Sequence, residues 1–210
     1  PGFPAFKTQR NEDLAERLAQ SLGRDVYVLH YRGLGQNLRG PFSFEASAEQ
    51  ATACIQWLRT KYQSLSFVGH SWGGGLTVRN FDKLDAGSIV FLISPLVLLP
   101  PKPALERLVN YIYNDAPQLF PGVTVPELLA DLARFATHFD SKAMVRKYEV
   151  PSKNLVYIQA KVDEETPVEY AREVVPCFKT KPLYIESEQD HSFTQDREAI
   201  YLLIEKAFKK

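Results

Sequence analysis

The chain has 210 residues, 45% of them hydrophobic, and its 25 basic and 25 acidic side chains cancel to a net charge of zero at pH 7. This length predicts one domain, at a prior of ~150 residues per domain, and the apolar content excludes a disordered chain. Neutral charge gives no electrostatic support for a nucleic-acid or anionic-membrane partner. With only two cysteines, a disulfide scaffold is excluded and we expect a reducing, cytoplasmic location.

The sequence contains no recognisable targeting or membrane segment. No apolar run reaches the ~18 residues that a membrane helix needs. The first residues, Pro1-Gly2-Phe3-Pro4, have neither the basic nor the apolar region of a signal peptide. They also lack an initiator Met, which is consistent with a fragment of a longer chain.

The first third of the chain predicts helix, strand and helix in that order. Asn11 is a candidate N-cap for a helix that ends at Gly23, with acidic residues in its first turn. The segment 25–31, DVYVLHY, is rich in β-branched and aromatic residues and predicts a strand. A second helix is expected from Ser47, where Gln50 stands at the position that completes a capping box.

Further along, strands and helices continue to alternate. The segment 88–94, SIVFLIS, is apolar on both faces, as in the strands of a parallel sheet. This alternation predicts an α/β fold with a right-handed parallel sheet flanked by helices. The other expected strands are 65–68, 154–160 and 182–186, and the other expected helices end near Lys83, begin near Pro167 and span 196–208.

The segment 96–152 interrupts this rhythm. It is rich in proline and holds two helical patterns, at 104–113 and 125–137, with no convincing strand. We interpret it as a helical cap inserted within a single domain, 1–210. Its aromatic residues either line a pocket for an acyl or aryl group or pack the cap onto the sheet; they are Tyr111, Tyr113, Phe120, Phe135 and Phe139.

The segment 69–73, Gly-His-Ser-Trp-Gly, matches G-x-S-x-G. It follows the strand SLSFV and enters a helix, which is the setting of a nucleophile elbow. Ser71 is therefore the candidate nucleophile, and the backbone N–H of Trp72 is a candidate oxyanion donor at the helix start. The alternative is a glycine-rich turn with a buried serine.

A serine nucleophile needs a base, and His191 is the candidate because it follows the last strand, where functional residues gather in such folds. A structural surface histidine is the alternative. The other histidines lie in a predicted strand, in the serine turn and in the cap; they are His30, His70 and His138.

The base in turn needs an orienting carboxylate, and Asp163 follows the strand 154–160. Glu164 and Glu165 are rivals in the same loop, and Asp190 is adjacent to the candidate base. An ordinary charged loop is the remaining alternative.

These motifs together resemble those of the α/β-hydrolases. The matches are GHSWGG at 69–74, VDEETP at 162–167 and DHSF at 190–193, and the order Ser71, Asp163, His191 is the family's order. The stretch YRGLG at 31–35, followed by GPFSF at 40–44, is similar to the R-G-x-G stretch of small esterases and serine peptidases in this superfamily.

The resemblance also covers the start of the chain. The opening PGFP resembles the family's H-G-x-P oxyanion loop, with Pro1 where histidine is usual. This implies that the N–H of Phe3 is the second oxyanion donor. The family has a strand immediately before this loop, and usually two more. Either such strands precede Pro1, or the sheet is smaller than the family's and has an exposed edge; we expect the former, since an unpaired edge of this kind favours aggregation.

We therefore expect a serine hydrolase that cleaves a carboxylic ester of a small-molecule acyl substrate through an acyl-enzyme. A thioesterase or serine peptidase with the same triad is an alternative, as is a catalytically silent hydrolase fold used for binding. No cofactor or metal is expected, since the sequence has no phosphate-binding loop and no Cys/His pattern of metal-ligand spacing. The sequence leaves the oligomeric state open.

Overall fold

A computed structural model describes residues 9–33, 37 and 40–209 of the chain. Its centre is a four-stranded sheet in the order β1-β2-β3-β4, with every neighbouring pair parallel. This confirms the predicted α/β fold with a parallel sheet flanked by helices. The strands are β1 (Phe67–His70), β2 (Val90–Ile93), β3 (Leu155–Val162) and β4 (Leu183–Asp190).

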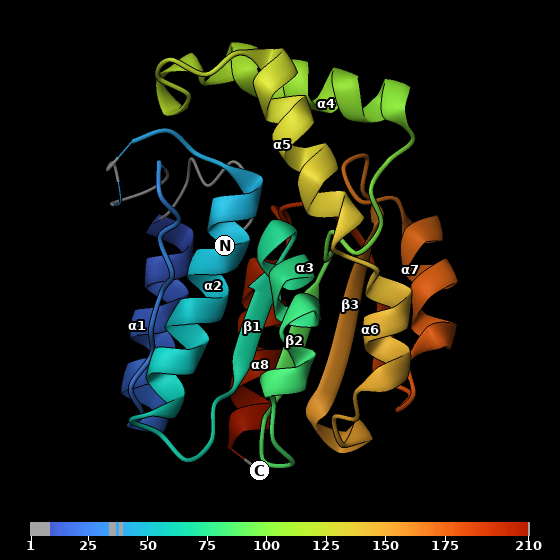
Figure 1. Ribbon diagram of the computed structural model, residues 1–210. Coiled ribbons are helices and arrows are strands. Elements are labelled where there is room, and N and C mark those ends of the chain that lie inside the picture. Colours follow the sequence, from blue (N-terminus) through green and yellow to red (C-terminus); the bar gives the residue numbers. More distant parts are fainter. Residues whose placement is uncertain (1–8, 34–36, 38–39, 210) are drawn as a thin grey trace.

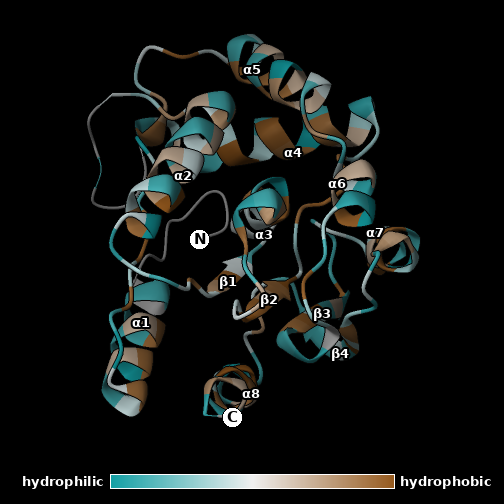
Figure 2. Ribbon diagram, turned by 60° about the horizontal axis from the view of Figure 1, so that its bottom comes forward, coloured by the Kyte–Doolittle hydropathy of each residue, from teal (hydrophilic) through white to brown (hydrophobic). Residues whose placement is uncertain are grey.

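Helices cover both faces of the sheet, so the molecule has three layers (Figure 2). Side chains of α3 (Trp72–Arg79), α6 (Ser141–Lys147) and α7 (Val168–Val174) share one buried cluster with one face of the sheet. Side chains of α1 (Gln9–Leu22) and α8 (Arg197–Phe208) share another cluster with the opposite face.

The strand β2 shows why its sequence forms a central strand. Val90 and Leu92 point into the cluster beneath α3, whereas Phe91 and Ile93 point into the cluster beneath α8. Successive side chains of a strand alternate between the two faces, so a strand that is apolar at every position must be covered on both sides. All four side chains of β2 are buried, as this reasoning predicts.

The helices α4 (Lys102–Asp115) and α5 (Val125–Thr137) lie over one end of the sheet (Figure 1). Both agree closely with the two helical patterns expected within 96–152. The helix α5 begins with a capping box between Thr124 and Glu127. The sequence did not predict α6, which lies beside β3 and α7 and packs on the sheet (Figure 1).

The helix α2 (Phe44–Arg59) joins the sheet layer to α5. Its N-cap is Ser43, whose hydroxyl accepts the N–H of Ala46 and donates to the Asp131 carboxylate of α5 at 2.9 Å. The predicted cap at Ser47 is wrong: Ser47 lies one turn inside the helix and its hydroxyl donates to the Phe44 carbonyl at 2.8 Å. Ser43 takes the cap because Asp131 supplies a negative charge at that end of the helix.

The helix α1 begins two residues before the predicted cap, at Gln9, so Asn11 lies inside it. It ends as expected, because Gly23 follows its last residue with φ +59° and donates its N–H to the carbonyl of Ala19.

The predicted strand at 25–31 is absent, and these described residues form extended chain without strand pairing. Together with β1, α1, α2 and α8, the segment lines a mostly apolar groove of about 700 Å³. Within the described part of the chain, β1 pairs with β2 alone. A strand forms only when it pairs with a neighbouring strand. The segment 25–31 and β1 line the same groove without pairing, so β-propensity alone does not make 25–31 a strand here.

No helix in the described ranges combines the length and apolar character required to cross a bilayer.

Candidate active site

One polar residue follows each strand at the same edge of the sheet. Ser71 follows β1, Ser94 follows β2, Asp163 follows β3 and His191 follows β4. Because the strands are parallel, their carboxyl ends share one edge, and ligands in open α/β sheets bind outside that edge. The helices α4 and α5 lie above it (Figure 1). The structure therefore brings the three candidate catalytic residues from the sequence to one edge of the sheet.

Ser71 occupies a strained turn between β1 and α3. Its backbone has φ 52° and ψ −121°, a combination that costs about 1–3 kcal/mol in a non-glycine residue. The turn is held from both sides: the Ser71 N–H donates to the carbonyl of Ile93 at 3.0 Å, and its carbonyl accepts the N–H of Leu96 at 2.9 Å. The residue is 5% exposed. The neighbouring strand end thus fixes the direction of the serine.

The glycines of the turn are required by close approach. A Cβ at Gly69 would lie 2.6 Å from Thr77 Oγ1 and 2.7 Å from the carbonyl oxygen of Gly73. A Cβ at Gly75 would lie 2.3 Å from the carbonyl oxygen of Leu96. A side chain at Gly69 would push α3 away from β1, and one at Gly75 would push α3 away from the segment after β2. The tight packing around the strand-to-helix turn therefore depends on glycine at both positions.

Backbone strain is concentrated at this edge of the sheet. The described non-glycine residues with positive φ are Ser71, Ser94 and Phe193, and each lies in a segment that immediately follows a strand. Such strain persists where the surrounding structure imposes it, and it clusters at functional sites. Its location agrees with that of the candidate catalytic residues.

His191 and Asp163 are brought into direct contact. The His191 Nδ1 lies 2.8 Å from Asp163 Oδ2, and the Asp163 side chain is fully buried. A carboxylate only accepts, so Nδ1 carries the proton and Nε2 is left as the basic nitrogen. A register shift between β3 and β4 near Ala160 and Val162 accompanies this placement, in keeping with the use of bulges to re-aim side chains near sites.

Four further donors hold the Asp163 carboxylate, and one of them is the Gln159 side-chain amide, which donates to Oδ2 at 3.3 Å. Its Oδ1 accepts the backbone N–H groups of Thr166 at 2.7 Å and Glu165 at 3.0 Å. Its Oδ2 accepts the Thr166 hydroxyl at 2.7 Å. The Gln159 side-chain amide in β3 donates to the Thr166 carbonyl at 2.7 Å and so holds the loop that follows β3. The carboxylate is therefore oriented before any substrate arrives.

Ser71 and His191 both follow strands at this edge of the sheet, but their side chains are not in direct contact through a hydrogen bond. Within the described residues, no hydrogen bond joins the Ser71 hydroxyl to the imidazole, and His191 Nε2 instead lies 3.4 Å from Glu165 Oε2. The residue before Ser71, His70, contacts His191 directly. Its Nε2 donates to the His191 carbonyl at 2.8 Å, and the centroids of the two imidazole rings are 4.8 Å apart. Catalytic hydrogen bonds are often loose without substrate and tighten on binding.

The electrostatics suit a neutral His70 and a basic His191. Burial, with a smaller effect of His191, lowers the pKa of His70 to about 3, so His70 stays neutral. Burial also acts to lower the pKa of His191, but the Asp163 hydrogen bond and the charges of Glu165, Asp163 and Asp190 outweigh it and leave that pKa raised. Burial raises the pKa of Asp163, and its hydrogen bonds to His191 and Thr166 outweigh this and lower it.

The two predicted oxyanion donors have different outcomes. Trp72 is the first residue of α3, so its N–H has no carbonyl partner within the helix and is available at the positive helix end. Phe3 lies outside the described residues. The Trp72 side chain is not a wall of the site: it is 1% exposed, packs on Phe44 and Phe135, and donates its indole N–H to Ser47 Oγ at 3.0 Å.

The cap aromatics mostly pack rather than line a pocket. Phe120 and Phe135 are buried in the cluster beneath α4 and α5, and Tyr113 and Phe139 are partly buried against it. Tyr111 points away and is 68% exposed. The packing interpretation of these residues therefore holds for four of the five.

Sequence reasoning missed Thr166, Gln159 and His70, and it treated Glu165 only as a rival acid. Of the four, Thr166 and Glu165 stand within three residues of Asp163, and His70 precedes Ser71. Proximity in the chain was a usable signal for these. No signal marked Gln159, because an amide in a strand reveals neither its burial nor the loop that it contacts.

Comparisons with known proteins show the family to which the chain belongs. The model of the "Alpha/beta hydrolase family" matches residues 1–207. The chain therefore belongs to the α/β-hydrolase family. Comparison with curated protein sequences finds no match.

Solved structures of similar fold include enzymes that act on esters. An esterase from Exiguobacterium antarcticum superposes with a TM-score of 0.68 at 16% identity, covering 100% of this chain and 90% of that one. A monoacylglycerol lipase from Paleococcus ferrophilus gives 0.64 at 17% identity, covering 96% and 89%. The protein Est1E from Butyrivibrio proteoclasticus, solved with ferulic acid, gives 0.64 at 14% identity, covering 98% and 84%. At these identities the likeness concerns the fold.

Proposed function

We propose that the chain is a serine hydrolase that cleaves a carboxylic ester of a small molecule through an acyl-enzyme. The observation that carries the proposal is the 2.8 Å contact of His191 with the buried Asp163, at the sheet edge where Ser71 is held in a strained turn. A structural role would require neither the strain nor the buried carboxylate. Family membership and the esterase and lipase of similar fold support the same reaction class.

In this mechanism the Ser71 oxygen attacks the substrate carbonyl while His191 Nε2 accepts the hydroxyl proton. Asp163 keeps the other nitrogen protonated and stabilises the imidazolium. The N–H of Trp72, with Phe3 as the proposed second donor, stabilises the oxyanion. His191 then protonates the leaving oxygen, the alcohol departs, and water activated by the same nitrogen releases the acid and restores Ser71. We assign 96–152 as the cap beneath which the substrate enters the single domain 1–210.

The nucleophile is tested by Ser71→Ala with Ser192→Ala as its control, since Ser192 neighbours His191 but has no role in the mechanism. On p-nitrophenyl acetate, Ser71→Ala is expected to lower kcat by ~10⁴-fold or more. A fluorophosphonate probe is expected to label the wild type and Ser192→Ala at one serine and to leave Ser71→Ala unlabelled. Near-normal turnover by Ser71→Ala, or labelling of a different serine, contradicts the proposal.

A substrate panel separates the ester reaction from its chemical relatives. We expect the highest kcat/KM on p-nitrophenyl esters and lower values on acyl-thioesters and aminoacyl amides. A reversed order would assign the same residues to a thioesterase or a peptidase. An absence of turnover and of labelling would indicate a binding protein with a hydrolase fold.

A further inference from the structure

The imidazole of His191 lies between two carboxylates. Asp163 contacts Nδ1 at 2.8 Å, and Glu165 Oε2 lies 3.4 Å from Nε2. The backbone N–H of Glu165 donates to Asp163 Oδ1, so the short loop after β3 fixes both residues together. Asp163 suffices to orient the ring, which leaves the second carboxylate without a function in the mechanism above.

Glu165 lies on the side of the site where the alcohol part of the ester is expected to leave. In the proposed reaction, Nε2 passes its proton to the oxygen of the departing alcohol. A carboxylate 3.4 Å from Nε2 therefore borders the space that the alcohol part of the ester occupies. The Glu165 side chain is 43% exposed, so a substrate can reach it.

Within the described residues, the one ion pair of Glu165 is with His191, and it is charged only when the imidazole is protonated. Burial raises its pKa, the charges of Asp163 and Asp190 raise it further, and His191 alone lowers it. Among the described residues, no lysine or arginine forms an ion pair with this carboxylate. The neighbouring Lys161 is engaged elsewhere, with Glu188. A positive charge carried by a substrate would supply the counter-charge that no described lysine or arginine provides.

We propose that Glu165 determines specificity for the leaving group and favours esters whose alcohol carries a positive charge, such as amino alcohols or quaternary ammonium alcohols. The inference rests on the proposed ester hydrolysis and deepens it. A cation bound at Glu165 would stand beside the leaving oxygen, and it would draw the carboxylate away from Nε2 and free that nitrogen for Ser71.

The test compares two esters of nearly the same shape: acetylcholine, and 3,3-dimethylbutyl acetate, in which an uncharged carbon replaces the nitrogen. The measurement is made at pH 8, where the carboxylate is ionised. The ratio of the two kcat/KM values is compared because the contributions of shape and hydrophobicity cancel in it. Because Glu165 is partly exposed, we expect a ratio of about 5 in favour of the cation, the upper range for an ion pair open to solvent.

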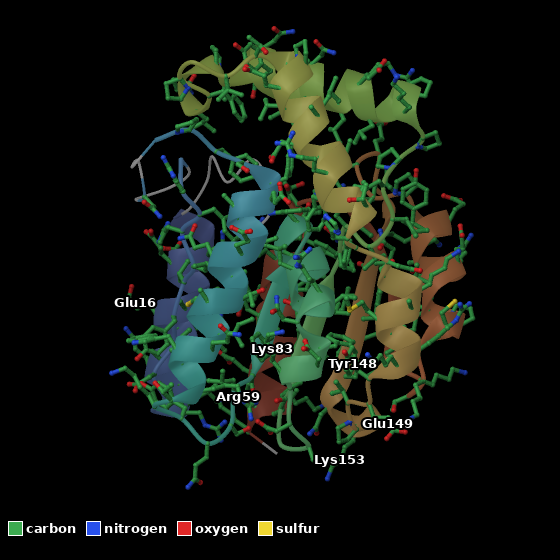
Figure 3. The ribbon with its side chains drawn as sticks, viewed as in Figure 1. Glu16, Arg59, Lys83, Tyr148, Glu149 and Lys153 are labelled. Atoms are coloured by element: carbon green, nitrogen blue, oxygen red, sulfur yellow. The ribbon has the colours of Figure 1, made fainter. Side chains whose placement is uncertain are left out.

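The variant is Glu165→Gln, which keeps the shape of the side chain and removes its charge. The kcat/KM ratio of this variant is expected to fall from about 5 to about 1. That roughly fivefold loss corresponds to the free energy of one exposed ion pair. The control is Glu149→Gln, which removes the same charge from an exposed residue paired with Lys179, at the end of the molecule opposite α4 and α5 (Figure 3). It is expected to keep the wild-type ratio.

The outcomes are distinguishable. An equal ratio in the wild type and in Glu165→Gln overturns the inference, as does a loss of kcat on both esters without a change of ratio, which would make Glu165 a positioning residue for the imidazole. Hydrolysis of p-nitrophenyl acetate is followed in parallel. If the wild type hydrolyses none of the three esters and Ser71 is not labelled by the phosphonate, the proposed function itself fails.

Discussion

Substitution of Asp163 by asparagine tests whether this residue determines which nitrogen of His191 carries the proton. The amide side chain replaces one of the two hydrogen-bond acceptors of the carboxylate by a donor. The Oδ1 position faces two fixed backbone donors, the N–H groups of Thr166 and Glu165 at 2.7 and 3.0 Å. An amide nitrogen placed there would face donor against donor in a buried site. The Oδ2 position faces His191, the Thr166 hydroxyl and, at 3.3 Å, the Gln159 amide. The hydroxyl can turn to the Ser94 carbonyl 3.2 Å away, and the amide already donates to the Thr166 carbonyl at 2.7 Å.

The backbone therefore selects the orientation in which the amide nitrogen points at His191. The imidazole must then accept at Nδ1 and carry its proton on Nε2, so it cannot take the proton of Ser71. We expect Asp163→Asn to lower kcat on p-nitrophenyl acetate by about 10⁴-fold, the loss that the wrong tautomer causes in a serine triad. The free energy of unfolding, measured by urea titration, shows whether the variant is folded at the assay temperature.

The matched control is Asp190→Asn. Asp190 precedes His191 in the chain, and its carboxylate accepts the N–H and the hydroxyl of Thr194 rather than the imidazole. We expect its kcat to fall by less than about 10-fold, since general acid–base catalysis stays intact. If Asp190→Asn loses activity while Asp163→Asn keeps at least a tenth of it, the acid has been assigned to the wrong residue.

Two further predictions concern pH and packing. Because the pKa of His191 is raised above 6.5 and the base must be neutral, kcat/KM on a neutral ester is expected to fall as the pH drops through that raised value; an inflection below 6.5 contradicts this. Gly69→Ala is expected to lower the free energy of unfolding in urea by about 3 kcal/mol. Gly122→Ala, where φ is +74° and the space is open, is expected to lower it by about 1 kcal/mol. Equal losses would show that crowding in the serine turn is relieved elsewhere.

Predictions from the sequence succeeded where neighbouring residues in the chain determine the local structure. The apolar run 88–94 predicts a strand covered on both faces, and β2 lies within it. The same patterns indicated which residues follow strands. In a parallel sheet these residues share an edge whatever the details of packing, so Ser71, Asp163 and His191 could be assigned to one end of the molecule from the sequence alone.

Where the prediction failed, the deciding partner is distant in the chain. The segment 25–31 has strand propensity but no ladder partner among the described residues, and propensity cannot replace one. The helix cap moved from Ser47 to Ser43 because Asp131, 88 residues further along, supplies a carboxylate at that helix end. A local window of sequence shows neither the missing strand pairing nor the distant carboxylate.

Apart from the segment 25–31 and the helix α6, the sequence by itself determined the order of strands and helices, the serine turn and the residues at the strand ends, because these follow from periodicity and from glycine. Only the tertiary structure decided which carboxylate faces which nitrogen of His191. Asp163 and Glu165 are two residues apart and chemically alike, yet one is buried on Nδ1 and the other is half exposed beside Nε2. Their different positions arise from the register of β3 against β4 and from the turn that Thr166 closes on the carboxylate, and both are products of the assembled fold.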